Sequence, residues 1–89
     1  MKATVQNMTS SKGNKIANQF IITSNEGETF QSYNSTIVQI TSKGTFLDAN
    51  FWNYSNTTSK YRNLFLDETS KETAKKIKEG VYKLINLNQ

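Results

Sequence analysis

The feature that most constrains this chain is the regular alternation of short β-branched and aromatic segments with polar turn sequences. Segments of strand character occupy residues 3–8, 16–23, 29–33, 37–41 and 45–47. The stretches between them are typical of tight turns, because they are polar and several contain glycine, which adopts a positive φ without steric cost. Strands joined by such short connections pair antiparallel. The pattern therefore predicts an antiparallel sheet of four to five strands, with one face that another layer must cover.

Two helices in the C-terminal half are predicted to provide that cover. Ser55 or Asn56 is a good N-cap for the first helix. Tyr61, Leu64 and Phe65 follow it at spacings of three and four residues, as one apolar stripe. The side chains expected to be buried in the core are Phe20, Ile22, Leu47, Leu64, Phe65 and Ile77.

The second helix has clearer boundaries. Thr69 and Glu72 have the spacing of a capping box, so a helix is predicted over about residues 70–79. Gly80 suits the left-handed position that follows a helix. Residues 81–87 then have the composition of a final strand that joins the sheet.

The length of the chain predicts a single domain. Residues 1–89 are expected to form one small α+β domain, and without cysteine its modest core has no disulfide to reinforce it. Five Phe, four Tyr and one Trp compensate in part, because each aromatic ring buries a large area.

The residue types needed for most catalytic and metal sites are missing. The chain has no His and no Cys, which excludes a histidine general base, a thiol nucleophile and the usual zinc ligands. Of the seven Asp and Glu residues, all except Asp48 lie in predicted turns or on predicted helix surfaces. No spacing suggests two carboxyl groups held across a cleft. We therefore expect no catalytic residue, no metal, no cofactor and no enzymatic activity.

The N-terminal sequence and the hydropathy of the chain indicate a location. Residues 1–6 lack the apolar segment of a secretion signal, and no apolar run approaches the roughly 20 residues of a membrane span. The protein is therefore expected in the cytoplasm, without a membrane partner.

The most informative segment for function is residues 51–63, where aromatic residues precede a hydroxyl-rich helix start and two cations. The first amides of a helix have no intrahelical partner and carry partial positive charge. A phosphate or carboxylate can dock there, with Lys60 and Arg62 closing over it and aromatic rings stacking a base. The predicted ligand-binding residues are Tyr54, Ser55, Thr57, Thr58, Lys60, Tyr61 and Arg62.

A purely structural interpretation of the same segment stays open. Ser, Thr and Asn commonly cap a helix without binding anything else, and Phe51 and Trp52 are natural core residues of a small sheet-and-helix domain. The pattern also lacks the glycine-rich spacing of a P-loop. Residues 60–83 hold seven cations against four acids, which favours a polyanionic partner, although lysines late in a helix are commonly its solvated face.

Four segments of the chain form a distinctive set. They are N-Q-F-I-I at residues 18–22, F-Q-S-Y at 30–33, W-x-Y-S-x-T-T-x-K-Y at 52–61 and K-I-x-x-G-x-Y-x-L at 76–84. In these segments the chain resembles a group of small phage-encoded proteins of unknown function, and Y-S-x-T-T-x-K is the most specific part. The resemblance covers residues 14–88. It implies a phage setting in the host cytoplasm, where small proteins commonly disable host machinery or sequester a nucleotide signal.

These observations support two functional hypotheses. The first is a non-catalytic phage protein that acts in host takeover or counter-defence by binding an anionic ligand, nucleic acid or nucleotide. The second is a protein-binding inhibitor of a host or defence enzyme, similar in role to anti-CRISPR proteins, which would bury an aromatic patch against its partner. Assembly as a homo-oligomer through an exposed edge strand is a third alternative.

Overall fold

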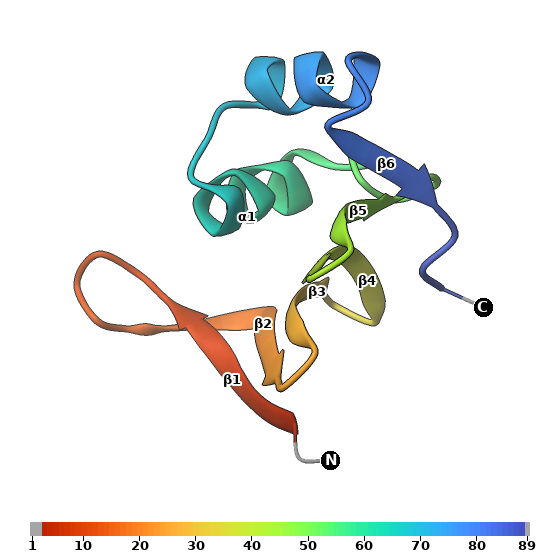
Figure 1. The fold of residues 1–89 in the computed structure, drawn as a ribbon. Helices are drawn as coiled ribbons and strands as arrows, with labels where there is room; N and C mark the ends of the chain where they lie inside the picture. The colour runs from red at the N-terminus through yellow and green to blue at the C-terminus, as the bar shows by residue number, and fades with distance from the viewer. Residues whose placement is uncertain (1–2, 89) are drawn as a thin grey trace.

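The computed structural model describes residues 3–88, which form one six-stranded β-sheet and two α-helices (Figure 1). The strands are β1 (Ala3–Thr9), β2 (Lys15–Ser24), β3 (Gly27–Ser32), β4 (Ser35–Thr41), β5 (Gly44–Asp48) and β6 (Tyr82–Ile85). The helices α1 (Asn56–Leu66) and α2 (Ser70–Lys78) lie between β5 and β6 in the chain. In the sheet the strands keep their chain order, β1-β2-β3-β4-β5-β6.

The first five strands form an antiparallel meander, and the sixth strand is parallel to its neighbour. Strands β1 to β5 pair in succession through short turns. Strand β6 pairs parallel with β5, because two helices separate these strands in the chain and return it in the same direction. The predicted α+β fold is confirmed, with its mostly antiparallel sheet, two helices in the C-terminal half and a final strand that joins the sheet.

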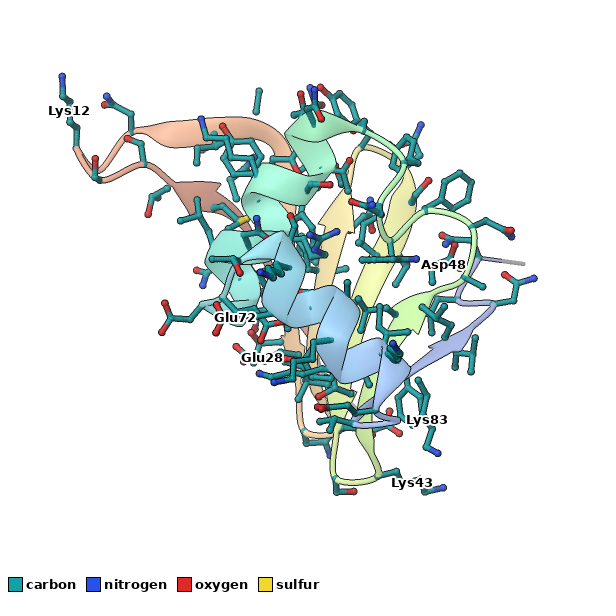
Figure 2. All side chains as sticks on the ribbon, turned by 90° about the horizontal axis from the view of Figure 1, so that it is seen from above. Lys12, Glu28, Lys43, Asp48, Glu72 and Lys83 are labelled. Carbon is teal, nitrogen blue, oxygen red and sulfur yellow. The ribbon has the colours of Figure 1, made fainter. Side chains whose placement is uncertain are left out.

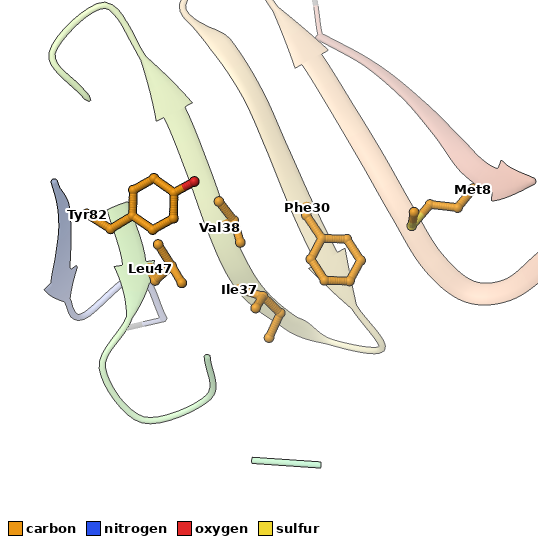
Figure 3. Close-up of a cluster of buried hydrophobic side chains, with 6 residues drawn as sticks. All are labelled: Met8, Phe30, Ile37, Val38, Leu47 and Tyr82. Atoms are coloured by element: carbon orange, nitrogen blue, oxygen red, sulfur yellow. The ribbon is translucent and has the colours of Figure 1, made fainter. Parts of the chain in front are cut away.

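The core lies between one face of the sheet and the helices. The buried hydrophobic residues are Met8, Phe30, Ile37, Val38, Leu47 and Tyr82 (Figure 3). Strand pairing places Phe30 opposite Val38 and Val38 opposite Leu47, so these side chains form a row across the sheet. Phe65 of α1 stacks on Phe30, with the ring centroids 5.7 Å apart. Each large apolar side chain buried in this way contributes about 1.5–3 kcal/mol, so the row is a main source of stability.

Two of the predicted core residues point to the other face of the sheet, away from the helices. Successive side chains of a strand alternate between faces. Ile21 pairs with the buried Phe30, so Phe20 and Ile22 on either side of it face the opposite way and are only half-buried. Their predicted burial in the core was wrong, because a run of consecutive apolar residues does not reveal which face of the sheet is covered.

Helix α1 buries two polar side chains beside its apolar contacts with the core. Its N-cap is Ser55, whose side chain accepts a hydrogen bond from the amide of Thr58, as predicted. Thr58 and Arg62 are fully buried, and Phe65 is half-buried. Leu64 is 58% exposed, so its predicted burial was wrong. Polar side chains four residues apart occupy the inward positions because they are hydrogen-bonded there, and Leu64 consequently faces outward.

Both predicted ends of α2 are confirmed. The side chain of Thr69 accepts a hydrogen bond from the amide of Glu72, and the Glu72 carboxylate accepts one from the amide of Thr69, which completes a capping box. At the other end Gly80 has a φ of 80°, and its amide and the next one donate to carbonyl oxygens of the last turn. This arrangement requires the left-handed conformation that glycine adopts without strain. Among residues 3–88, no helix is long and apolar enough to cross a membrane.

Asp48, at the end of β5, holds the loop that leads to α1 and also the C-terminal segment. Its side chain is fully buried and accepts hydrogen bonds from the amides of Asn50, Phe51 and Leu87 at 3.0, 2.9 and 2.7 Å. Burial alone would raise the pKa of this carboxyl group, but the hydrogen bonds outweigh burial, and the pKa lies below its ordinary value. Both carboxylate oxygens of Asp48 therefore serve the fold.

Glu68, in the connection between the helices, joins α2 to β6. Its side chain is 3% exposed, and its Oε1 atom accepts hydrogen bonds from Lys76 Nζ at 2.6 Å and from the Tyr82 hydroxyl at 2.9 Å. The hydroxyl of Thr73 donates to the other carboxylate oxygen. Burial alone would raise the pKa of Glu68, but these hydrogen bonds outweigh burial, and the pKa lies below its ordinary value. The cluster fixes the position of α2 over the end of the sheet.

Candidate binding groove beside the first helix

The structure divides the predicted binding residues at the start of α1 into two groups. The inward group is Ser55, Thr58 and Arg62, and the accessible group is Tyr54, Thr57, Lys60 and Tyr61. The polar atoms of the inward group form hydrogen bonds within the protein. A ligand can therefore reach only the accessible group.

Arg62 is fully buried, and its guanidinium group connects three parts of the chain. One terminal nitrogen donates to the carbonyl oxygen of Trp52 at 2.5 Å, and the group lies 5.2 Å from the centroid of the Trp52 ring. The other donates to Ser70 Oγ at 2.8 Å and to Asn63 Oδ1 at 2.9 Å. Burial lowers the pKa of Arg62, and the charge of Glu68 opposes this effect. The expectation that Arg62 is an exposed cation was therefore wrong, since it links the loop before α1 to the start of α2.

The hydroxyl groups of Ser55 and Thr58 are also used internally. Ser55 caps α1, as described above, and Thr58 Oγ1 lies 3.0 Å from Ser32 Oγ of β3. Both Thr58 and Ser32 are fully buried, so this hydrogen bond joins the first turn of α1 to the sheet. Of the predicted site residues, Ser55 therefore caps the helix and Thr58 packs it against the sheet.

Lys60 and Tyr61 border a groove between α1 and the loop of the β1–β2 hairpin. The groove has a volume of about 270 Å³ and is lined by Ser10, Ser11, Ile16, Lys60, Tyr61 and Leu64. Lys60 Nζ lies 5.3 Å from the centroid of the Tyr61 ring. Figure 2 shows Lys12 at the tip of the hairpin loop. An apolar surface formed by Ile16, Leu64 and the Tyr61 ring is thus bordered by one cation and by hydroxyl groups.

The wall formed by the hairpin loop is shaped by Ser10. Its hydroxyl oxygen accepts hydrogen bonds from the amides of Lys12 and Asn14 at 3.3 and 3.2 Å. Its amide donates to the carbonyl oxygen of Asn14 at 2.8 Å, and its carbonyl oxygen accepts from the amide of Gly13 at 2.9 Å. These bonds give the loop a defined shape, with Lys12 in it and Lys15 at its end.

Tyr54 and Thr57 are exposed at the start of α1 but do not line the groove. Tyr54 is 47% exposed, and its ring packs edge-on against Phe51 with the centroids 5.2 Å apart. Of the seven predicted residues, the structure therefore brings Lys60 and Tyr61 into a common hollow, and leaves Tyr54 and Thr57 on the neighbouring surface.

Four of the residues that line the groove were not predicted as binding residues, and these are Ser10, Ser11, Ile16 and Leu64. Each of them has an ordinary local interpretation, as a loop, a strand start or a core position. The groove arises where the hairpin loop lies against α1, a contact between segments distant in sequence. One feature of the sequence could have indicated the groove. The two segments that form its walls, within residues 3–25 and 49–66, contain no Asp or Glu.

Another hollow, of about 400 Å³, lies at the turns β2–β3 and β4–β5. Its lining residues are Asn25, Glu26, Gln39, Thr41, Ser42, Lys43 and Phe46. One acid and one cation balance each other there, so this hollow does not select a ligand by charge. In the described part of the chain, no three His, Cys, Asp or Glu side chains gather in a way that could hold a metal ion.

Comparison with known proteins matches most of the chain to one family. Residues 3–80 match the model of a family described as "Family of unknown function (DUF8033)". No curated protein and no solved structure matches the chain. The matched residues run from β1 to the end of α2, so both walls of the groove lie within the family domain.

Proposed function

We propose a binding function for this chain, which belongs to the family of unknown function DUF8033. In this proposal it binds a nucleotide, or one unit of single-stranded nucleic acid, in the groove between α1 and the β1–β2 hairpin, and catalyses no reaction. The observation that carries the proposal is the composition of the groove. An aromatic ring and two aliphatic side chains adjoin a lysine there, and the segments that form the walls hold no carboxylate.

The charge of the walls favours an anionic ligand. The hairpin contributes Lys12 and Lys15 and α1 contributes Lys60, while all seven carboxylates of the chain lie outside residues 3–25 and 49–66. A phosphate at the mouth of the groove would meet Lys60 and hydroxyl groups, and no carboxylate lines the groove. Such a distribution also attracts an anion over a distance, which raises the rate of association.

The apolar part of the groove suits the flat face of a base. Tyr61 packs against the core with part of its ring, so its orientation is fixed before any ligand arrives. Stacking of a base on an aromatic side chain contributes about 1–3 kcal/mol. The volume of about 270 Å³ lies just below the range of roughly 300–1,000 Å³ that is typical of small-molecule pockets. We therefore propose a ligand portion no larger than one base with its sugar.

The lining side chains support binding without catalysis. They include no histidine, cysteine or carboxylate, the side chains that most often act as general base or nucleophile. The resemblance of residues 14–88 to small phage-encoded proteins supports a setting in host takeover or counter-defence in the host cytoplasm. In that setting the protein would sequester a nucleotide signal or cover single-stranded nucleic acid.

A titration at two salt concentrations tests the proposal. Labelled single-stranded RNA and DNA, and a set of nucleoside phosphates, are added at about 50 and about 200 mM salt, because phosphate contacts weaken steeply as salt rises. Lys60→Ala should weaken binding by about tenfold, the effect of losing one charged hydrogen bond of about 1.5 kcal/mol. Lys71→Ala removes an exposed lysine of α2 outside the groove and is the matched control.

The stacking part of the proposal has its own variants. Tyr61→Phe keeps the ring and should keep most of the affinity, whereas Tyr61→Leu should lose about 1–3 kcal/mol of binding free energy. Absence of binding by the wild type at low salt would contradict the proposal. Capture of a host protein that survives Lys60→Ala and high salt, but not Leu64→Asp, would instead support the alternative of a protein-binding inhibitor.

A further inference from the structure

We propose that β1 pairs with the β1 strand of a second copy of this chain. The two strands would run antiparallel about a twofold axis at Val5, so that two sheets become one continuous sheet. This inference is independent of the binding groove, because it rests on the edge of the sheet.

One side of β1 has no partner strand. In residues 3–88, β1 stands at the end of the strand order and pairs with β2 alone. Figure 1 shows it at the edge of the sheet, remote from α2 and β6. Along its free side, backbone N–H and C=O groups of alternate residues point outward without a strand to receive them. Such an edge is a template for the addition of another strand.

The two edges of the sheet differ in their protection against such pairing. Strand β6 has 4 residues and includes Lys83, and both a short length and a lysine hinder strand addition. Strand β1 has 7 residues, ATVQNMT, without a charge or a proline. Its register with β2 is regular from Ala3 to Asn7, and an irregularity follows only between Asn7 and Thr9. The segment 3–7 is therefore a regular, uncharged edge.

The segment is also self-complementary, which favours a second copy over a foreign peptide. Val5 lies at its centre and is 60% exposed, although β-branched residues favour burial between strands. A twofold axis at Val5 sets this side chain against its copy and sets Ala3 against Asn7 of the other chain. The pair would bury Val5 next to Ile22, its partner on β2, and would bring no charge against a like charge.

The lysines of the hairpin loop do not meet in this arrangement. Apart from Lys2, which directly precedes β1 in the sequence, the nearest cations are Lys12 and Lys15, at the hairpin loop. In an antiparallel pair the hairpin loops of the two copies point to opposite ends, so these lysines stay apart. Pairing along one short strand buries little surface, so the association should be weak and visible only at high protein concentration.

Sedimentation equilibrium from about 10 µM to about 1 mM protein tests the proposal over the range expected for weak association. The wild type should pass from monomer to dimer. Val5→Lys and Val5→Glu should each weaken the dimer by at least about tenfold, because like charges meet at the axis. An equal mixture of the two variants should dimerise again, because opposite charges then meet. Val81→Lys places the same charge on a residue that is 58% exposed and far from β1 in sequence, and should change nothing.

Amide hydrogen exchange on the wild type provides a test that needs no variant. Protection of residues 3–9 should rise with protein concentration, while protection of β6 stays constant. A wild type that remains monomeric at about 1 mM would overturn the proposal. A dimer that tolerates Val5→Lys, that is equally weakened by Val81→Lys, or that protects other residues would overturn it as well.

Discussion

Two regions of the molecule, the β1–β2 hairpin and the assembly of β5, α1, α2 and β6, are held together by different interactions. In the assembly, three buried polar residues join segments that are distant in sequence, and these are Asp48, Arg62 and Glu68. In the hairpin, residues 3–6 are exposed, and β1 is held by backbone pairing and by a hydrogen bond from the Asn7 side chain to the carbonyl oxygen of Ile16. Met8 is the one residue of β1 that reaches the core.

This difference indicates which region of the fold can change conformation at low energetic cost. Opening the assembly would leave buried polar groups without partners, and each such group costs about 1–3 kcal/mol. Separating β1 from β2 exposes one core side chain, Met8, and leaves no buried polar network without partners. Regions of this second kind have low local stability and commonly carry binding functions. The hairpin carries the free edge and one wall of the groove, whereas the other wall, α1, belongs to the assembly, so each proposed function involves the adaptable region.

The largest expected effect comes from removing the guanidinium group that joins the assembly. Arg62→Ala should lower the free energy of unfolding by about 3–5 kcal/mol, because several charged hydrogen bonds are lost and the Trp52 carbonyl group is left buried without a donor. Urea denaturation followed by circular dichroism measures the change. Lys60→Ala, two residues away on the exposed side of α1, should cost less than about 0.5 kcal/mol. A loss of under about 1 kcal/mol for Arg62→Ala would show that other contacts hold this region.

A smaller effect is expected from acid. The pKa values of Asp48 and Glu68 are lowered in the folded protein, so unfolding raises them to their ordinary values of 3.8 and 4.5. The stability that these groups contribute is complete above those values and is lost as pH falls through them toward the lower, folded pKa values. The free energy of unfolding, measured at several pH values between 7 and 3, should therefore decrease below about pH 5.

Variants of Asp48 and Glu68 test whether this loss of stability in acid arises in the assembly. Asp48→Asn and Glu68→Gln should each lower stability at neutral pH and flatten its decrease in acid, whereas Glu26→Gln, at an exposed turn, should leave the profile unchanged. If the decrease in acid persists at full size in both variants, acid destabilises the fold by a different route.

The smallest effect compares one glycine in each region. Gly13 in the hairpin loop and Gly80 after α2 have φ values of 81° and 80°, and an added Cβ would meet no atom within 4 Å at either position. Replacement by alanine therefore introduces the same backbone strain, about 1 kcal/mol. Gly80→Ala should lower the global stability by this amount. Gly13→Ala should change it by less than about half as much, and should mainly accelerate amide exchange in residues 3–9. Equal effects would show that hairpin and assembly unfold as one unit.

Local signals in the sequence predicted most of the fold. The capping box of Thr69 and Glu72 and the left-handed position of Gly80 marked both ends of α2, and the turn sequences separated the strands of the meander. These features are decided by neighbouring residues, so they can be read from a short segment. The faces of the elements are decided by distant contacts, and there the predictions for Phe20, Ile22 and Leu64 failed.

The candidate site was less predictable for the same reason. From the sequence, Arg62 is expected to be an exposed cation. Its burial becomes favourable only because the fold brings the Trp52 carbonyl group and Ser70 next to it. Lys60 and Tyr61 were identified from the sequence. Their partners across the groove were not, because the hairpin loop is brought to α1 by the fold as a whole.

The parallel pairing of β5 with β6 divides the folding of this chain into fast and slow contacts. Neighbouring strands of the meander need only close short loops, which takes microseconds or less. Strand β6 is separated from β5 by a long segment that contains both helices, and closure over such a distance is slower and costs more entropy. Until then β5 is itself an open edge of the nascent sheet. The partly folded chain therefore has two open edges, β1 and β5, of which the finished protein covers β5 with β6.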